Sequence, residues 1–263
     1  MQIYTHTLPG GAQLIGYLRD RTVEMPAFNT RPAILILPGG GYAWCSKREA
    51  DPVAMQFLQA GYNVFTLYYT CRSDETVPAL RWQPLIDAAG AILHIRRNAE
   101  QFGTDPAKIA ICGFSAGGHL ALSAAVLDIP GETAQQRPNA VILGYPVITA
   151  GEFAHRGSFV QLAGSEDAAA QQAFTLEDKV TSDTPPVFVW HTMEDKTVPV
   201  ENTLLLLAAL RRAGVPCEAH LFEKGAHGTS ISTAEVDAAD PHRAHWVALC
   251  LEWLGETFGF KLS

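Results

Sequence analysis

The sequence lacks the segments that would take a chain into a membrane or across one. No run reaches the ~18 apolar residues of a transmembrane helix, and the first six residues have neither the basic nor the apolar part of a secretory signal. Basic blocks are also absent: 19 Lys and Arg stand against 27 Asp and Glu, a formal net charge of −8. We therefore expect a cytoplasmic protein that binds neither membranes nor nucleic acids.

Clusters of metal-binding residues are scarce as well. The five cysteines are odd in number and scattered, so we expect reduced and mostly buried thiols. His242 and His245 have nearly the spacing of a metal-binding pair, but no cluster of further ligands accompanies them. No Gly-x-Gly-x-x-Gly motif opens a helix after the first strand, which argues against a dinucleotide site. The sequence thus predicts neither a metal ion nor a cofactor.

What the chain does contain is a regular alternation of strand-like and helix-like runs. Two short strands around Pro9-Gly10-Gly11 predict an antiparallel hairpin. A polar loop over 20–32 follows, and from residue 33 onward apolar runs of strand length alternate with helical patterns. The further strands are expected at 33–37, 63–68, 109–112, 140–143, 187–190 and 218–222. This pattern predicts a mostly parallel sheet of about eight strands with helices on both faces.

The alternation is interrupted once, over residues 149–184. This stretch is polar, rich in Ala and Gln, and short of apolar periodicity. No internal repeat or low-complexity linker divides the chain of 263 residues. We therefore expect a single domain over 1–263, with an insertion at 149–184 that would suit a lid.

The central motif is Gly113-Phe114-Ser115-Ala116-Gly117-Gly118, set between a strand-like and a helix-like run. Glycines two residues either side of the serine allow a sharp turn that lifts the hydroxyl above the sheet edge. A plain turn is the alternative interpretation, because a bare Gly-x-Ser-x-Gly recurs by chance. Its place between a strand and a helix favours Ser115 as a nucleophile.

A serine nucleophile needs a base and a group that orients the base. Asp195 follows the strand at 187–190, and His227 follows the strand at 218–222. Both loops are expected at the sheet edge that carries Ser115, in the chain order Ser, Asp, His. We predict His227 as the base and Asp195 as the acid, with Glu194 as the alternative acid.

Backbone N–H groups are suited to stabilise the oxyanion, because they need no side-chain ordering. Ala116, directly after the nucleophile, supplies one candidate. The glycine loop (Pro38–Tyr42), which follows the strand at 33–37, supplies the others. We choose Gly40 and Gly41 as donors and keep Gly39 as a further candidate.

Taken together, these motifs resemble the α/β-hydrolase fold and, within it, the small esterases related to hormone-sensitive lipases. The nearest likeness is to the bacterial branch similar to acetylxylan esterases and feruloyl esterases. The resemblance is carried by Leu37–Tyr42, Gly113–Leu120, Trp190–Pro199 and Gly225–Gly228. It implies Ser115 as nucleophile, Asp195 as acid, His227 as base and oxyanion donors in the glycine loop. Relatives of the lipases usually begin that loop with His, where this chain has Pro38, which favours the acetyl-esterase branch.

The substrate is expected to be a small ester. A long acyl chain needs a broad apolar groove or an apolar lid, and the insertion at 149–184 is mostly polar. Aromatic residues expected near the mouth of the site would stack on a sugar or a phenolic alcohol portion, or else pack under loops: Tyr42, Trp44, Trp82 and Phe114.

The leading hypothesis is a carboxylesterase that cleaves short-acyl esters, with acetyl as the first choice and acetylated xylo-oligosaccharides as candidate substrates. One alternative keeps the triad but cleaves an amide or peptide, as formamidases and prolyl-oligopeptidase-type enzymes do. The other is a non-catalytic binding protein on a hydrolase fold.

Overall fold

The strands form one sheet in the computed structural model, which describes residues 1–74, 76–128 and 134–262. Within those residues the eight strands lie in the order β1-β2-β4-β3-β5-β6-β7-β8. Their bounds are β1 Gln2–Thr7, β2 Gln13–Leu18, β3 Arg31–Leu37, β4 Asn63–Tyr68, β5 Thr104–Phe114, β6 Ala140–Gly144, β7 Val187–Thr192 and β8 Cys217–Phe222. The β1–β2 and β2–β4 pairs are antiparallel and all the others are parallel. The predicted α/β architecture is confirmed.

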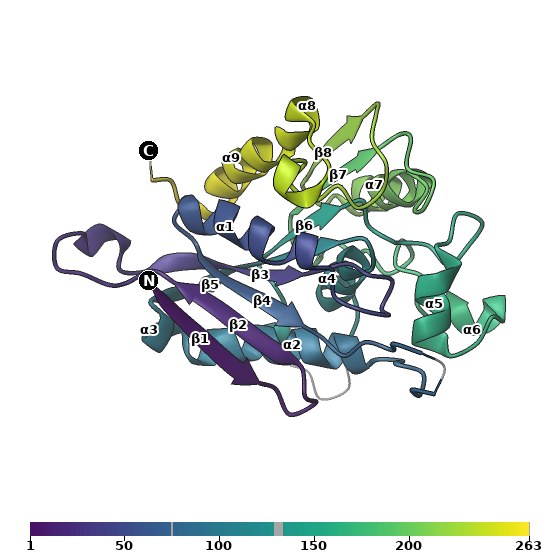
Figure 1. Ribbon diagram of the computed structural model, residues 1–263, viewed down its shortest axis with the longest axis horizontal. Coiled ribbons are helices and arrows are strands. Elements are labelled where there is room, and N and C mark those ends of the chain that lie inside the picture. The colour runs from purple at the N-terminus through teal and green to yellow at the C-terminus, as the bar shows by residue number, and fades with distance from the viewer. Residues whose placement is uncertain (75, 129–133, 263) are drawn as a thin grey trace.

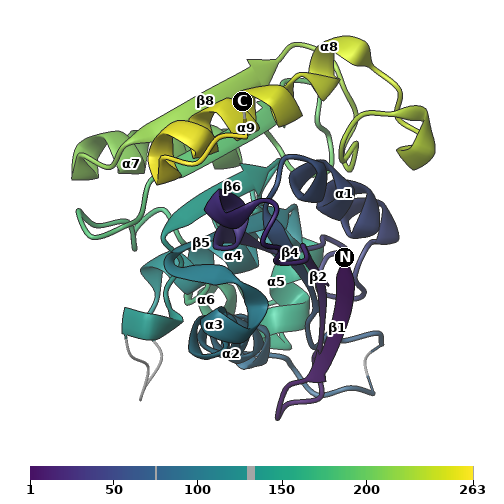
Figure 2. The same cartoon turned by 90° about the vertical axis from the view of Figure 1, so that its left-hand side faces the viewer.

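Helices cover both faces of this sheet, as Figures 1 and 2 show. The longer helices are α1 Asp51–Gln59, α2 Gln83–Arg97, α4 Ala116–Val126, α5 Arg156–Ala163, α7 Glu201–Ala213 and α9 Trp246–Phe258. The shorter ones are α3 Ala99–Phe102, α6 Ala168–Gln172 and α8 Pro241–Ala244, with single 3₁₀ turns η1 Pro26–Phe28, η2 Lys47–Glu49, η3 Ala134–Gln136 and η4 Ala234–Val236. Helices α1 and α9 pack on one face, and α2, α4 and α7 pack on the other.

Each central strand contributes to two cores, because successive side chains point to opposite faces. In β3, Ile34 and Ile36 pack in the core beneath α1 and α9, whereas Leu35 and Leu37 join the core beneath α2 and α4. All four are fully buried. A strand buried on both faces must be apolar throughout, which is why its sequence does not alternate.

Strands β3 and β5 begin earlier than the sequence indicates. The sequence predicts a loop over 20–32 and a strand only from residue 109, but Arg31 pairs with Thr104 and both strands start there. The ladder shifts register between Arg31 and Ala33. Pro32, which lacks an N–H to donate, lies at that irregularity, where a proline is tolerated in a sheet.

The closing helical segment is capped at its first turn. The Asp240 side chain accepts hydrogen bonds from the backbone N–H groups of His242 and Arg243, and Pro241 occupies the first helical position. The helix then divides at His245 into α8 and α9.

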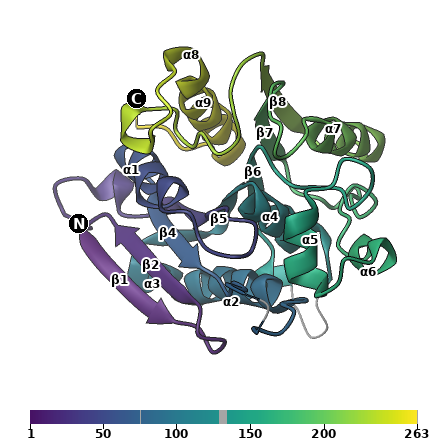
Figure 3. The ribbon, with the colours of Figure 1, turned by 45° about the vertical axis from the view of Figure 1, so that its right-hand side comes forward.

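The insertion at 149–184 carries α5 and α6, which contact each other and lie together on the right of Figure 3. Phe159 and Leu162 of α5 are buried in the core beneath α2 and α4. These anchors fix α5 against the body of the protein. Across the described ranges, no helix has the length and hydropathy to span a membrane.

The cysteines are all free thiols. Cys112 and Cys250 are buried, but Cys45 and Cys71 are half-buried and Cys217 is exposed. The sequence predicts mostly buried thiols, but only two of the five cysteines are buried.

Helix α1 offers a test of the core it covers. Phe57 is fully buried, whereas Met55 on the same helix is 38% exposed. Phe57→Ala should lower the free energy of unfolding by about 3–5 kcal/mol, because it removes apolar contacts and leaves a cavity. Met55→Ala should change it by less than about 0.5 kcal/mol. Urea unfolding followed by fluorescence measures both, and equal losses would contradict this assignment of the core.

Candidate active site

Ser115 occupies a sharp turn between β5 and α4. Its backbone has φ 54° and ψ −119°, a region that non-glycine residues rarely adopt. The start of α4 crosses closely over the end of β3: a Cβ on Gly117 would lie 2.1 Å from the Leu37 carbonyl oxygen. Only glycine fits there. The Ser115 N–H donates to the Gly144 carbonyl at the end of β6, at 3.0 Å. The turn is therefore held from both neighbouring strands.

Three predicted residues meet at this turn. The Ser115 hydroxyl lies 2.8 Å from Nε2 of His227, and Nδ1 of His227 lies 2.6 Å from Oδ2 of Asp195. Asp195 follows β7 and His227 follows β8, so three separate strands bring the groups together. The carboxylate accepts the Nδ1 proton, which leaves Nε2 free to accept from the serine.

Asp195 is held from four directions. Its Oδ1 accepts from the N–H groups of Thr197 and Val198, both at 2.9 Å. Its Oδ2 accepts from His227 and, at 3.2 Å, from Nε2 of His191. Burial alone would raise the pKa of Asp195, but hydrogen bonds from His191 and His227 outweigh it and hold the pKa below its ordinary value. The carboxylate is therefore ionised at neutral pH.

His191, in the last part of β7, is fully buried and was not among the predicted site residues. Nε2 faces two acceptors, Asp195 and the Val198 carbonyl at 3.0 Å, so it carries the proton. Nδ1 accepts from the hydroxyl of Thr203 at 2.8 Å. His191 comes four residues before Asp195 in the chain. Only the tertiary structure shows that its imidazole donates to the Asp195 carboxylate.

The expected oxyanion donors lie beside the serine. Within the described residues, the backbone N–H groups of Gly40, Gly41 and Ala116 donate to no protein acceptor. Gly40 has φ 126°, and a Cβ there would lie 2.1 Å from the Trp44 carbonyl oxygen. Gly39 differs, because its N–H donates to the carboxyl of Glu49 at 2.7 Å.

A cavity of about 340 Å³ opens over Ser115 and His227. The segment from Gly40 to Glu49 and the insertion supply most of its wall. The lining residues are Gly40, Gly41, Ala43, Trp44, Ser46, Arg48, Glu49, Ser115, His155, Gly157, Gln161, Thr197, His227 and Gly228. His155 from the insertion is half-buried. Burial is the main cause that lowers the pKa of His155, and the charge of His227 lowers it further.

Of the four aromatic residues predicted at the mouth, only Trp44 lines the cavity, and its side chain is 63% exposed. Tyr42 is buried, and its hydroxyl bonds His119. Phe114 is buried against Tyr145 and Trp246. Trp82 lies 4.7 Å from the ring of Phe174, away from the cavity. The prediction for these three is corrected: none lines the cavity, the side chains of Tyr42 and Phe114 are buried in the packing of the protein, and Trp82 is 41% exposed elsewhere.

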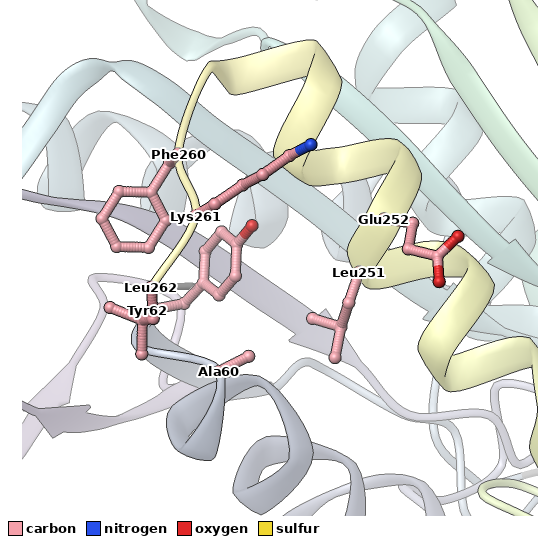
Figure 4. Close-up of a pocket in the computed structure, with 7 residues that line it drawn as sticks. All are labelled: Ala60, Tyr62, Leu251, Glu252, Phe260, Lys261 and Leu262. Carbon is pink, nitrogen blue, oxygen red and sulfur yellow. The ribbon is translucent and has the colours of Figure 1, made fainter.

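A second hollow of about 380 Å³ lies between the end of α1 and the end of α9 (Figure 4). Tyr62, Glu252 and Lys261 are its titratable residues, among apolar side chains from α9 and from the segments that follow α1 and α9. Its lining contains no serine or histidine, whereas the cavity over Ser115 is lined by both Ser115 and His227. The cavity over Ser115 is therefore the candidate active site.

Two families match the chain in overlapping parts. Residues 91–260 match the prolyl oligopeptidase family, and residues 23–142 match the family described as BD-FAE. The crystal structure of an acetyl ester-xyloside bifunctional hydrolase from Caldicellulosiruptor lactoaceticus superposes with a TM-score of 0.82 at 35% identity, covering 97% of this chain and 90% of that one. The chain belongs to the α/β-hydrolase esterases. This membership favours an enzyme over the alternative of a non-catalytic protein.

Two curated proteins are also similar to this esterase. Endo-1,4-beta-xylanase B of Butyrivibrio fibrisolvens is 39% identical over 235 residues, covering 84% of this chain and 35% of the relative. Acetylxylan esterase of Xylanibacter ruminicola is 30% identical over 232 residues, covering 85% of this chain and 45% of the relative. The esterase thus spans less than half the length of either protein.

His119 joins the glycine loop of the esterase to its insertion. Nδ1 accepts from the Tyr42 hydroxyl at 2.7 Å, and Nε2 donates to the Phe174 carbonyl at 2.7 Å. Burial lowers the pKa of His119 from 6.5 to about 4. The folded protein therefore keeps this imidazole neutral at pH values where the unfolded chain protonates it.

This burial predicts a loss of stability in mild acid. The unfolded chain binds one more proton than the folded protein between about pH 6.5 and pH 4, so the free energy of unfolding falls as the pH falls through that window. His119 should contribute up to about 3 kcal/mol of the fall. His119→Gln should remove this part of the pH dependence. Tyr42→Phe, which keeps the buried imidazole, should retain it, and urea unfolding at several pH values compares the three proteins.

Proposed function

We propose that the esterase cleaves short-acyl esters, with acetyl as the acyl group, through Ser115, His227 and Asp195. The observation that carries this proposal is the unbroken chain of hydrogen bonds from Asp195 through His227 to Ser115 at the floor of an open cavity. The likeness to an acetyl ester hydrolase of nearly the same length supports it.

In the first half of the reaction, the Ser115 oxygen attacks the ester carbonyl while Nε2 of His227 takes the serine proton. The carbonyl oxygen becomes an oxyanion, which the N–H groups of Gly40, Gly41 and Ala116 are proposed to stabilise. Removing one such donor typically costs about 3 kcal/mol of barrier. His227 then gives its proton to the leaving alcohol oxygen, and the acyl group stays on Ser115.

In the second half, a water molecule replaces the alcohol. His227 takes a proton from this water as the water attacks the acyl carbonyl, and the same N–H groups stabilise the second oxyanion. The acid leaves when the serine oxygen is reprotonated by His227. Ionised Asp195 stabilises the imidazolium in both halves, because it lies 2.6 Å from Nδ1.

The cavity favours a small acyl group and a polar alcohol. Its volume of about 340 Å³ is near the lower end for ligand sites. Polar side chains from three segments line it, among them Arg48, Gln161 and Thr197. The exposed face of Trp44 suits stacking on a sugar ring. We therefore propose acetylated xylo-oligosaccharides as substrates, in line with the acetylxylan esterase among the relatives.

We also propose that residues 1–263 form one hydrolase domain with 149–184 as an insertion. The insertion contributes His155, Gly157 and Gln161 to the cavity wall. It would therefore shape the part of the site that receives the substrate.

The nucleophile is tested on p-nitrophenyl acetate. Ser115→Ala should reduce turnover by at least about 10³-fold, because it removes the attacking oxygen, and it should leave the circular dichroism spectrum unchanged. Ser123→Ala is the matched control: Ser123 is a buried serine on α4 whose hydroxyl donates to the His119 carbonyl. It should keep turnover near the wild-type rate. Wild-type turnover by Ser115→Ala would refute the proposed nucleophile.

The substrate class is tested with a panel of esters. The kcat/KM for p-nitrophenyl acetate should exceed that for the octanoate, because the cavity has little room for a long chain. Trp44→Ala should raise KM for acetylated xylo-oligosaccharide, with a loss of roughly 1 kcal/mol expected for an aromatic contact, and should leave KM for p-nitrophenyl acetate nearly unchanged. Faster cleavage of the octanoate would contradict the short-acyl preference.

The match to the prolyl oligopeptidase family over 91–260 keeps a second candidate, in which the same triad cleaves an amide. The acylation chemistry would be the same, with an amine as the leaving group. Rates measured side by side on N-formylkynurenine, a peptide substrate and acetylated xylo-oligosaccharide separate the two candidates.

A further inference from the structure

Glu49 is a buried acid that the proposed mechanism does not use. Its side chain is 3% exposed, and in the described part of the chain no basic group lies within ion-pair distance of its carboxyl. Burying a carboxyl without an opposite charge is costly, and an apolar side chain would fill the same space at lower cost. The position of Glu49 therefore calls for an explanation other than stability.

The two carboxyl oxygens of Glu49 bind two different segments. Oε2 accepts from the backbone N–H of Gly39 at 2.7 Å, and Oε1 accepts from the hydroxyl of Tyr145 at 2.6 Å. The Gly39 carbonyl in turn accepts from the N–H of Ser46 at 2.9 Å. The glycine loop is thus tied at Gly39 on both its N–H and its carbonyl, directly before the proposed donors Gly40 and Gly41.

Tyr145 carries the connection to the histidine loop (Glu223–Ser230). Its oxygen accepts from the backbone N–H of Ser230 at 2.9 Å, and its ring lies edge-on to the ring of His227 at 4.9 Å. The Ser230 hydroxyl donates to the Arg48 carbonyl at 2.5 Å. The histidine loop is therefore joined to η2 both through Tyr145 and directly.

Glu49 also lies close to the nucleophile. A Cβ on Gly39 would lie 2.7 Å from Oε2 of Glu49 and 3.0 Å from Cβ of Ser115. The Glu49 carboxyl and the Ser115 side chain thus both lie against Gly39, on the side where a Cβ would stand. Burial raises the pKa of Glu49, and hydrogen bonds from Tyr145 and Gly39 oppose the rise.

We propose that Glu49 is a positioning residue for the esterase reaction, which acts with Tyr145 to fix the glycine loop relative to the histidine loop. This inference rests on the proposed function, in which the glycine loop supplies the oxyanion donors Gly40 and Gly41 and the histidine loop supplies the base His227. The oxyanion forms between these loops, so a shift of either one misaligns it. A misplacement of about 1 Å costs about 10²-fold in rate.

Glu49→Gln tests the proposal with nearly constant shape. The amide oxygen can accept from the Gly39 N–H, but the amide NH₂ group can only donate, so the Tyr145 hydroxyl loses the acceptor for its proton. On p-nitrophenyl acetate we expect kcat to fall about 10- to 100-fold while KM changes by less than about twofold, since ground-state binding is retained. The rate of labelling by a fluorophosphonate should fall by a similar factor, because that adduct needs the same donors.

Asp87→Asn is the matched control. Asp87 is also a buried acid, 2% exposed, and it accepts from the backbone N–H of Thr70 at 2.9 Å and from the Gln83 side chain. It does not line the cavity. Its variant should lose stability and keep kcat. Equal stability losses in both variants, with kcat unchanged in both, would overturn the proposal and leave Glu49 a structural residue.

Tyr145→Phe keeps the test decisive if Glu49→Gln does not fold. Removing the hydroxyl separates Glu49 from Ser230 while the ring stays packed, and kcat should again fall with KM nearly constant. In the double variant the two losses should not multiply, because both break one connection. Multiplicative losses, or a wild-type kcat in Tyr145→Phe, would refute the coupling.

Ser115→Ala distinguishes failure of the proposed function from failure of the inference about Glu49. If Ser115→Ala retains turnover, the proposed function fails and Glu49 positions nothing in it. If Ser115→Ala is inactive and both Glu49→Gln and Tyr145→Phe turn over at the wild-type rate, the proposed function stands and the inference about Glu49 fails.

Discussion

The pairing of β3 with β5 is the constraint on which the site depends. Leu37 lies opposite Gly113 at the carboxyl ends of these strands, although the two residues are far apart in the chain. The segments that follow them, the glycine loop and the Ser115 turn, must therefore leave the sheet side by side. The close approach of Gly117 to the Leu37 carbonyl then fixes the direction of α4. Without that register, the proposed oxyanion donors and the nucleophile would not face the same point.

The same sheet edge brings in the other two groups by steps across neighbouring strands. Gly144 pairs with Trp190, and Thr192 pairs with Phe222, so β6, β7 and β8 end in sequence along the edge. Asp195 and His227 follow the last two of these strands. The Asp195 carboxylate is held in part by backbone groups, because its Oδ1 accepts from the N–H groups of Thr197 and Val198. Backbone donors lose little freedom on binding, so the carboxylate is held in one orientation before the reaction begins.

How much of this could be predicted from the sequence depends on the range of the interaction involved. Ser115, Asp195 and His227 could be placed at one edge because strand ends and chain order are local signals. Glu49 could not, because its burial depends on Tyr145, almost a hundred positions later in the chain. His191 was missed for a similar reason: its partner Thr203 lies on the next helix.

The aromatic residues show a different limit. Tyr42 is the last residue of the glycine loop and was expected at the mouth of the site, but its φ of 64° turns the chain so that its hydroxyl reaches His119 inside the protein. Phe114 precedes the serine by one residue and therefore points to the opposite side of the strand, into the core. A residue's distance in sequence from a catalytic group says little about the direction of its side chain.

Backbone strain is concentrated where these loops meet. Among the described residues, seven non-glycine residues have positive φ, and four of them surround the site: Tyr42, Ser115, Tyr145 and Ser230. Each such conformation costs of order 1–3 kcal/mol and persists only when its surroundings determine it. Three of the four take part in the side-chain hydrogen bonds of His119, His227 and Glu49. The two buried cores on either side of the sheet supply the stability that offsets this strain, which is why the strained loops can stay fixed at the sheet edge rather than relax.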